Sequence, residues 1–205
     1  MTLSAQLWSD NADVAADVLA HPFVRGVGDG SLPRTLFAGY LAQDAFFLES
    51  FARAYALALA RSPDTSTLLT LADLLTGVRQ ELGLHASYAG SWGIDMAGVE
   101  ALPATLAYTE FLLATAAAQD LGVIFAAMTP CMRLYAWLGA SLDAANAGPY
   151  AEWVTTYSDP GFEETALLLE RLLDEQADDS VIVRATYRRA MHLELAFFEA
   201  AFTQG

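Results

Sequence analysis

The 205-residue chain contains no lysine, a single cysteine and only three histidines. Without lysine, the protein cannot form a catalytic Schiff base, attach pyridoxal phosphate or complete a P-loop. One cysteine excludes an intrachain disulfide and a zinc site built from several thiolates. Glu81 and His85 stand four residues apart, but the sequence offers no further Glu-x-x-His set for a metal pair. We therefore predict no metal and no cofactor.

Basic residues are also scarce: ten arginines stand against 25 acidic residues, for a formal net charge of −15. Basic patches hold a phosphate backbone, so nucleic acid is not an expected partner. The N-terminal MTLSAQLWSDNADV lacks the basic and apolar regions of a signal peptide. The apolar runs at 57–60 and around 121–132 are too short or too interrupted to cross a bilayer. We expect a cytoplasmic protein without a membrane partner.

Hydrophobic residues make up 55% of the chain and charged residues 17%, which favours one large core. Apolar residues recur every three or four positions, as in helices. The pattern predicts an all-α, single-domain bundle of seven or eight helices over residues 1–205. The expected helices cover roughly 4–20, 32–60, 65–89, 103–119, 120–145, 149–159, 161–177 and 179–203. VRGVGDGS is expected to be a loop, with Ser31 capping the next helix and Asp120 capping a later one.

Two carboxylates interrupt apolar helix faces. Asp44 lies in the stripe Phe37, Leu41, Asp44, Leu48, Phe51, Tyr55, and Glu194 in the stripe Tyr187, Met191, Glu194, Leu195, Phe198, Phe202. A buried carboxylate needs a partner or a raised pKa. A structural hydrogen bond would explain Asp44, and a solvent-facing boundary position would explain Glu194. Together, however, two such acids on distant helices favour acid/base chemistry.

The segment MTPCMRLYAWLG (128–139) places a proline directly before the lone Cys131. Pro130 cannot donate to the carbonyl of Ala126, so a bend is expected that opens space beside the thiol. Tyr135 lies one turn further on the same face. Cys131 is then either a nucleophile or a small buried hydrophobic residue. Tyr108, Tyr157 and the other nearby aromatic residues suit a flat heteroaromatic ligand and an ordinary core equally well.

Several blocks, in order, resemble the TenA-like thiaminase II family in its cysteine-containing branch. They are HPFVRGVGDGSLP with FAGYLAQD, MTPCMRLYAWLG, EWVTTYSDPGF and HLELAFFEAAF. The resemblance covers nearly the whole chain. It implies a haem-oxygenase-like helical fold, usually as a homotetramer. It also implies hydrolysis of 4-amino-5-aminomethyl-2-methylpyrimidine to the hydroxymethyl compound in thiamin salvage, with thiamin cleavage in some members.

The same resemblance implies roles for individual residues. Cys131 corresponds to the nucleophile, Glu194 to the acid/base group, and Asp44 to the carboxylate that binds the pyrimidine and assists catalysis. Phe47, Tyr108, Tyr135 and Tyr157 correspond to residues that surround the substrate. Members often have a tyrosine where this chain has Phe46 or Phe47, which bears on substrate preference rather than on reaction type.

Three other functions remain possible on this fold: an oxidative enzyme, a regulator and a pyrimidine carrier. Few histidines disfavour iron chemistry, and the acidic charge disfavours direct DNA contact. A carrier would not need Cys131 or Glu194, so their presence favours an enzyme. The sequence identifies neither the preferred aminopyrimidine nor the group that would ionise Cys131.

Overall fold

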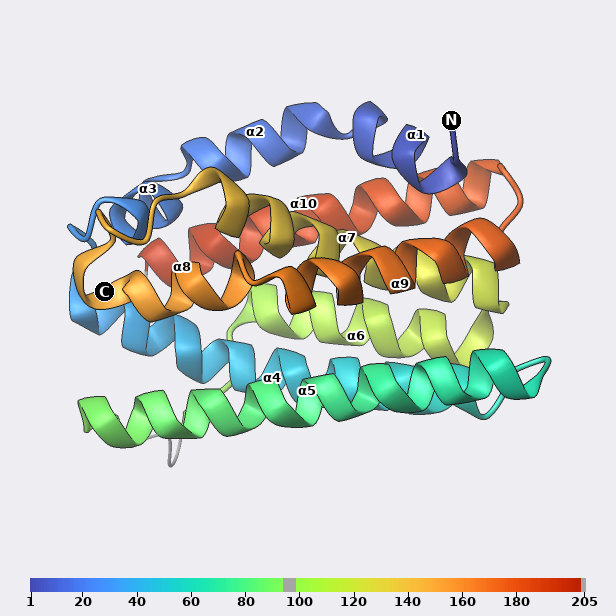
Figure 1. Cartoon of the computed structure of the whole chain (residues 1–205), viewed down its shortest axis with the longest axis horizontal. Helices are drawn as coiled ribbons and strands as arrows, with labels where there is room; N and C mark the ends of the chain where they lie inside the picture. The colour runs from blue at the N-terminus through green and yellow to red at the C-terminus, as the bar shows by residue number, and fades with distance from the viewer. Residues whose placement is uncertain (94–98, 204–205) are drawn as a thin grey trace.

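The computed structural model describes residues 1–93 and 99–203, without the side chains of residues 80, 84–88 and 91. This part of the chain forms ten α-helices and one short 3₁₀ helix, and it contains no β-strand. The prediction of an all-α fold is confirmed (Figure 1). The elements are α1 (Leu3–Asp10), α2 (Ala12–Ala20), α3 (Pro22–Gly28), α4 (Arg34–Leu59), α5 (Thr65–Trp92), α6 (Pro103–Ala118), α7 (Leu121–Ser141), η1 (Gly148–Tyr150), α8 (Ala151–Tyr157), α9 (Pro160–Gln176) and α10 (Val181–Thr203).

The long helices run along the longest axis of the molecule, with α5 on one side and α1 to α3 on the other (Figure 1). The central helix is α7, which packs against α9, α10, α8, α6 and α4. Buried apolar side chains from Leu7 in α1 to Ala201 in α10 belong to one hydrophobic cluster. Burial against α7 therefore holds helices together that are far apart in sequence.

Helix α7 is the most apolar long helix, and Pro130 lies inside it without ending it. Asp120 caps its start by accepting a hydrogen bond from the Val123 amide, as predicted. Because α7 continues to Ser141, it is long and apolar enough to cross a membrane, contrary to the expectation for this run. However, 78% of its most apolar window is buried inside the molecule, as in a core helix.

The predicted helix boundaries were wrong at the N-terminal end. The expected helix over 4–20 is two helices, α1 and α2, separated at Asn11, whose side-chain Nδ2 donates to the Leu7 carbonyl. The expected loop VRGVGDGS is helical up to Gly28. Glycine at position 26 serves close packing here, because a Cβ atom would lie 3.1 Å from the Cβ of Leu32. Ser31 does not cap α4, which begins after Pro33.

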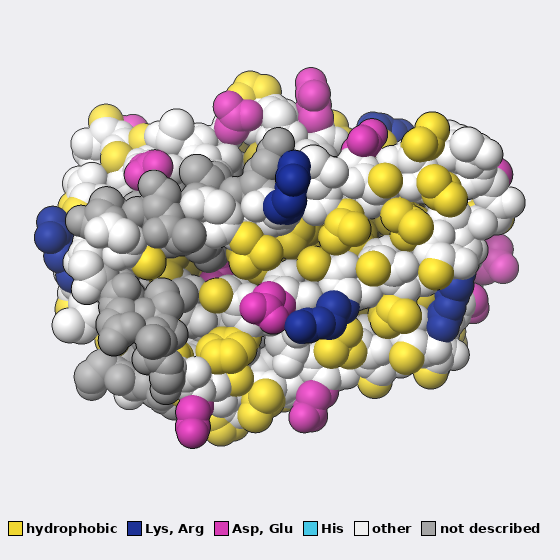
Figure 2. Space-filling view, turned by 90° about the horizontal axis from the view of Figure 1, so that it is seen from below, with side chains coloured by type: hydrophobic (Ala, Val, Ile, Leu, Met, Phe, Trp, Pro, Cys, Tyr) yellow, Lys and Arg dark blue, Asp and Glu magenta, His cyan; other side chains and the backbone are white. Residues whose placement is uncertain are grey.

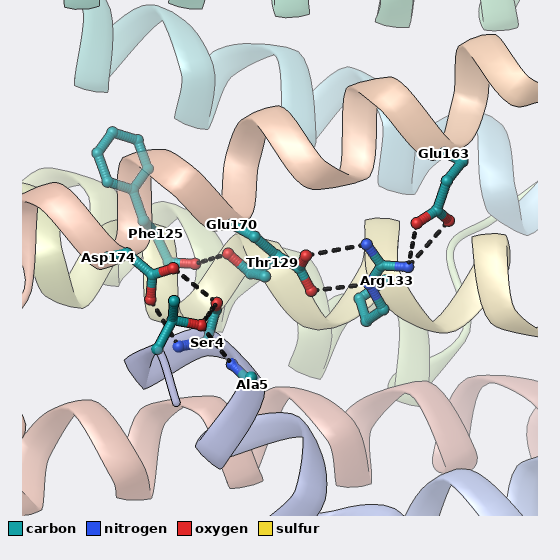
Figure 3. Close-up of polar contacts among 9 residues, drawn as sticks. Ser4, Ala5, Phe125, Thr129, Arg133, Glu163, Glu170 and Asp174 are labelled. Atoms are coloured by element: carbon teal, nitrogen blue, oxygen red, sulfur yellow. Dashed lines mark hydrogen bonds and ion pairs between the residues drawn. The ribbon is translucent and has the colours of Figure 1, made fainter.

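Charged side chains on α9 fix α7 and α1 in place (Figure 3). The Arg133 guanidinium donates to Glu170 through Nε (2.7 Å) and Nη2 (2.9 Å), and to both carboxylate oxygens of Glu163 through Nη1. Ser4 donates through its amide and hydroxyl to Asp174. Arg133 is the basic residue nearest to Cys131 in sequence, but its charge is balanced by carboxylates of α9.

Candidate active site

A buried chamber lies where α4, α5, α7, α8 and the start of α9 meet. Its walls include five of the residues that the sequence singled out, namely Asp44, Phe47, Cys131, Tyr135 and Tyr157. Leu48, Phe51, Glu81, Met132 and Phe162 complete the described lining. The free volume is about 10 Å³, which is the space of a single water molecule. Side chains must therefore move before a ring of pyrimidine size can enter.

Asp44 and Phe47 reach the chamber from the buried face of α4. Both are 4% exposed. Burial raises the pKa of Asp44 well above its usual value, and the negative charges of Glu81 and Glu194 raise it further. The ring of Phe47 lies 4.7 Å from that of Tyr108, between centroids. The apolar stripe of α4 thus carries one carboxylate into a site where a positively charged ligand would be stabilised.

Glu194 of α10 is also buried, at 2% exposure, and it does not face solvent. The Tyr108 hydroxyl donates to Glu194 Oε1 at 2.7 Å. Burial raises the pKa of Glu194 to about 7, while hydrogen bonds with Tyr108 and with the Cys131 thiol act in the opposite direction. A carboxyl group with a pKa near neutrality can both accept and donate a proton at physiological pH.

Cys131 lies beside this carboxylate. Burial raises the pKa of the thiol well above its usual value, and the charges of Glu194, Glu81 and Asp44 raise it further. The resting cysteine is therefore a protonated thiol, and no lowered pKa activates it. Its hydrogen bond with Glu194 supplies a proton acceptor instead.

Tyr135 of α7 and Tyr157 of α8 line the chamber side by side. The hydroxyl groups of Tyr135 and Tyr40 lie 3.1 Å apart, and the Tyr157 hydroxyl donates to Glu81 Oε1 at 2.7 Å. The rings of Tyr135 and Tyr157 meet edge to face at 4.8 Å between centroids. These contacts fix the orientation of both predicted tyrosines.

Sequence reasoning missed Glu81 as a site residue. It considered Glu81 only as a metal ligand with His85, whose side chain lies outside the described residues. Burial raises the pKa of Glu81, although the hydrogen bond from Tyr157 opposes this effect. Among the described residues, no group of three histidine, cysteine or acidic side chains is arranged to hold a metal ion. In the sequence, Glu81 is a lone acidic residue, and such residues are common on solvent-facing helices, so no local signal marked it as part of the site.

A model of the TENA/THI-4/PQQC family matches residues 8–203. The chain belongs to this family. The family resemblance seen in the sequence is thereby confirmed. A TENA/THI-4/PQQC match over nearly the whole chain also accounts for the order in which the resembling blocks occur.

Relatives of known name support the same assignment. The chain is 32% identical to the aminopyrimidine aminohydrolase of Halalkalibacterium halodurans, over 100% of this chain and 97% of that protein. It is 36% identical to the bifunctional TH2 protein, mitochondrial, of Arabidopsis thaliana, over 87% of this chain and 34% of that protein. The chain thus spans about a third of the length of that larger relative.

Solved structures show the fold. A TenA family transcription regulator from Silicibacter sp. TM1040 superposes with a TM-score of 0.90 at 27% identity, covering 97% of this chain and 96% of that one. A domain of unknown function with a haem-oxygenase-like fold from Shewanella denitrificans gives a TM-score of 0.80 at 17% identity, covering 98% and 92%. The haem-oxygenase-like fold is therefore confirmed.

Proposed function

We propose that the protein is an aminopyrimidine aminohydrolase. It hydrolyses 4-amino-5-aminomethyl-2-methylpyrimidine to the hydroxymethyl compound in thiamin salvage, and it also accepts thiamin. The observation that carries the proposal is the set of three carboxylates, Asp44, Glu81 and Glu194, around the Cys131 thiol. All three act on the pKa of this thiol. The described lining of the chamber contains no arginine or histidine. Such a site stabilises a positively charged ring and provides both a nucleophile and a proton carrier.

Catalysis begins with transfer of the thiol proton from Cys131 to Glu194 as the sulfur adds to the ring carbon beside the aminomethyl substituent. The raised pKa of the thiol means that the sulfur and the proton move together rather than through a resting thiolate. Asp44 binds the ring nitrogen and the 4-amino group, and it stabilises the positive charge of the protonated ring. Binding a cation also relieves the repulsion among the three carboxylates.

The addition breaks the aromaticity of the ring and lets its electrons expel the substituent. The C–N bond breaks, its electron pair leaves with nitrogen, and Glu194 returns its proton to the departing amine. Water then adds to the exposed methylene carbon and gives a proton to Glu194. The C–S bond breaks last, and the thiol of Cys131 regains that proton. A pKa of about 7 suits Glu194 to both directions of proton transfer.

The aromatic residues hold the ring in position. Phe47, Tyr135 and Tyr157 line the chamber, and Tyr108 packs behind Phe47 without lining it. Their hydroxyl groups are already engaged with Glu194, Tyr40 and Glu81. The rings therefore offer flat apolar surface, while the carboxylates provide the polar recognition.

The deciding experiment measures turnover of the aminomethylpyrimidine and of thiamin by wild type and by Cys131→Ser, with products identified by mass. Hydroxymethylpyrimidine formed by wild type alone supports the hydrolase and the nucleophile together. Turnover that survives in Cys131→Ser contradicts covalent catalysis. Tight binding of both compounds without turnover contradicts the enzyme and favours a carrier.

A further inference from the structure

A second, larger pocket of about 640 Å³ lies beside the buried chamber, and exposed residues such as Glu152 stand at its rim. Glu81, Met132 and Phe162 line both this outer pocket and the chamber. These three side chains therefore form a partition between a space that solvent reaches and the space beside Cys131. A solvent molecule that approaches a ring in the chamber from this side must pass the partition.

The polar groups of the chamber are few, and its free volume of about 10 Å³ has room for one water molecule. In the proposed reaction Asp44 binds the ring, and Cys131 becomes bonded to it. The Tyr135 hydroxyl is already paired with that of Tyr40. Glu81 is the carboxylate of the described lining to which the proposed reaction assigns no bond.

Glu81 is held at the partition by one of its two oxygens. Its side chain is half-buried, and the Tyr157 hydroxyl donates to Oε1 at 2.7 Å. No hydrogen bond to Oε2 joins it to another described residue. A carboxylate oxygen only accepts hydrogen bonds, so Oε2 suits an O–H donor that arrives from the outer pocket.

A buried hydroxyl at the same boundary independently indicates a ligand. Tyr55 of α4 is 1% exposed and lines the outer pocket, and its hydroxyl has no hydrogen-bond partner among the described residues. The charges of Cys131 and Glu81 both act on this hydroxyl, which places it near the partition. A buried polar group without a partner is destabilising, so it usually has a functional reason.

We infer that Glu81 and Tyr55 bind the water molecule that attacks the methylene carbon, and that this water arrives singly from the outer pocket. The inference rests on the proposed function, because it assumes a ring that is bonded to Cys131 and has lost its amine. One O–H of the water donates to Glu81 Oε2, and the Tyr55 hydroxyl donates to the water oxygen. The other lone pair of this oxygen forms the C–O bond, the electron pair of the exocyclic C=C bond moves into the ring, and the second O–H proton passes to Glu194.

This arrangement favours water over other nucleophiles. Its two O–H groups serve two carboxylates, Glu81 and Glu194, whereas an alcohol has one O–H group and would leave one carboxylate without a donor. A site built around a hydrogen bond discriminates strongly against a molecule that cannot make it. Glu81 therefore helps to decide that the pyrimidine is hydrolysed rather than transferred to another nucleophile.

Rapid-quench single turnover of the aminomethylpyrimidine separates the two halves of the reaction. Ammonia release reports cleavage of the C–N bond, and hydroxymethylpyrimidine reports water addition. In Glu81→Gln the amide oxygen can still accept from Tyr157, but the NH₂ group donates towards the water instead of accepting from it. We expect alcohol formation to slow by about a hundredfold and ammonia release to change far less. Intact-protein mass should then show a pyrimidine adduct on Cys131.

Two further variants keep the test independent of folding. Tyr55→Phe retains the ring and removes only an unpaired hydroxyl, and it is expected to slow the same step by about two- to tenfold, as for one neutral hydrogen bond. Glu152→Gln is the matched control, because it removes a carboxylate that lines the outer pocket but not the chamber, and neither step should change. Equal slowing of both steps in Glu81→Gln, without an adduct, would indicate a structural role and overturn the inference.

Competition with methanol provides the second measurement. In mixtures of methanol and water, mass spectrometry gives the ratio of hydroxymethyl to methoxymethyl product. We expect this ratio to fall in Glu81→Gln and to stay at the wild-type value in Glu152→Gln. A ratio that Glu81→Gln leaves unchanged overturns the inference while the hydrolase stands. Wild type that releases no ammonia from the aminomethylpyrimidine overturns the proposed function, and the inference with it.

Discussion

At the residue scale, the proton of Glu194 links the stability of the protein to its chemistry. Its carboxyl group is enclosed by α10, by Tyr108 of α6 and by Cys131 of α7. The loss of hydration on burial outweighs the two hydrogen bonds, so the pKa rises from 4.5 to about 7. The same desolvation keeps the thiol protonated. The hydrogen bond between the Cys131 thiol and the Glu194 carboxyl group therefore already contains the proton that the proposed reaction transfers.

The raised pKa of Glu194 predicts a dependence of stability on pH. Below pH 4.5 the carboxyl group is protonated in both the folded and the unfolded chain, and its contribution is fully present. Between pH 4.5 and about 7 only the unfolded chain loses this proton, so the free energy of unfolding falls, by on the order of 3 kcal/mol. Asp44 and Glu81, whose pKa values are also raised, add to the same slope.

Urea unfolding at a series of pH values from 4.5 to 7.5 measures this slope. Glu194→Gln is expected to make it shallower, because the glutamine has no proton to lose. The exposed control Glu110→Gln is expected to leave it as in wild type. Identical slopes for wild type and Glu194→Gln would contradict the raised pKa.

At the element scale, close approach of helices positions the site. Gly139 of α7 lies against the end of α8, and a Cβ atom there would overlap the backbone of Tyr157 and Ser158. Gly139→Ala must displace α8, which carries Tyr157. We expect a loss of about 1–3 kcal/mol in the free energy of unfolding, together with weaker substrate binding.

Gly39 provides the matched comparison for Gly139. It lies on the exposed face of α4, where a Cβ atom would meet nothing within 4 Å. Gly39→Ala is expected to be neutral or to stabilise by up to about 1 kcal/mol, because alanine favours helix more than glycine does. Thermal or urea unfolding measures the change in the free energy of unfolding for both variants. Equal changes for Gly139→Ala and Gly39→Ala would contradict the packing argument.

The attachment of α9 to α7 depends on Arg133. Its side chain is 12% exposed and that of Glu170 is 14% exposed, so little solvent screens this pair. Arg133→Met leaves the Glu170 carboxylate poorly compensated, and we expect a loss of about 3–5 kcal/mol in the free energy of unfolding. Arg53→Met, which breaks an exposed pair with Glu49, is expected to cost under about 1 kcal/mol. A loss below 1 kcal/mol for Arg133→Met would show that this contact is dispensable.

At the scale of the whole molecule, the face on the α5 side carries many apolar side chains with few charges between them (Figure 2). Leu69 of α5 is 57% exposed, Leu68 is 39% exposed and Leu106 of α6 is 44% exposed. Exposed apolar area of this kind favours self-association. The homotetramer implied by the family resemblance stays a prediction, as does a cytoplasmic location.

Self-association through this face can be tested by substitution. Leu69→Glu places a charge in the apolar surface and is expected to shift the protein towards smaller species in sedimentation velocity experiments. Leu167→Glu is the control, because Leu167 is 40% exposed on α9. An assembly that both variants leave intact would exclude the α5 face as the interface, and an entirely monomeric wild type would contradict the predicted oligomer.

The sequence by itself determined the helical class, most helix positions and the identity of Asp44, Glu194 and Cys131 as unusual residues. These features are local: apolar spacing of three and four residues reveals a helix, and a carboxylate within an apolar stripe stands out as a candidate for burial. Glycine-containing segments could not be assigned from the sequence, because a glycine is compatible both with a loop and with a close contact between helices. The stretch around Gly26 was therefore wrongly predicted to be a loop, although it is part of α3.

Only the tertiary structure decided how these residues meet. It brought Glu81 of α5 to Tyr157 of α8, and Tyr108 of α6 to Glu194 of α10, through contacts between helices that no spacing rule relates. It also set the direction of the pKa changes, since desolvation depends on every atom packed around a group rather than on its neighbours in sequence. Cys131, Asp44 and Glu194 were visible in the chain. Asp44 and Cys131 share one chamber, and Glu194 bonds to Cys131 from beside it, only because burial of apolar surface against α7 gathers the helices that carry them.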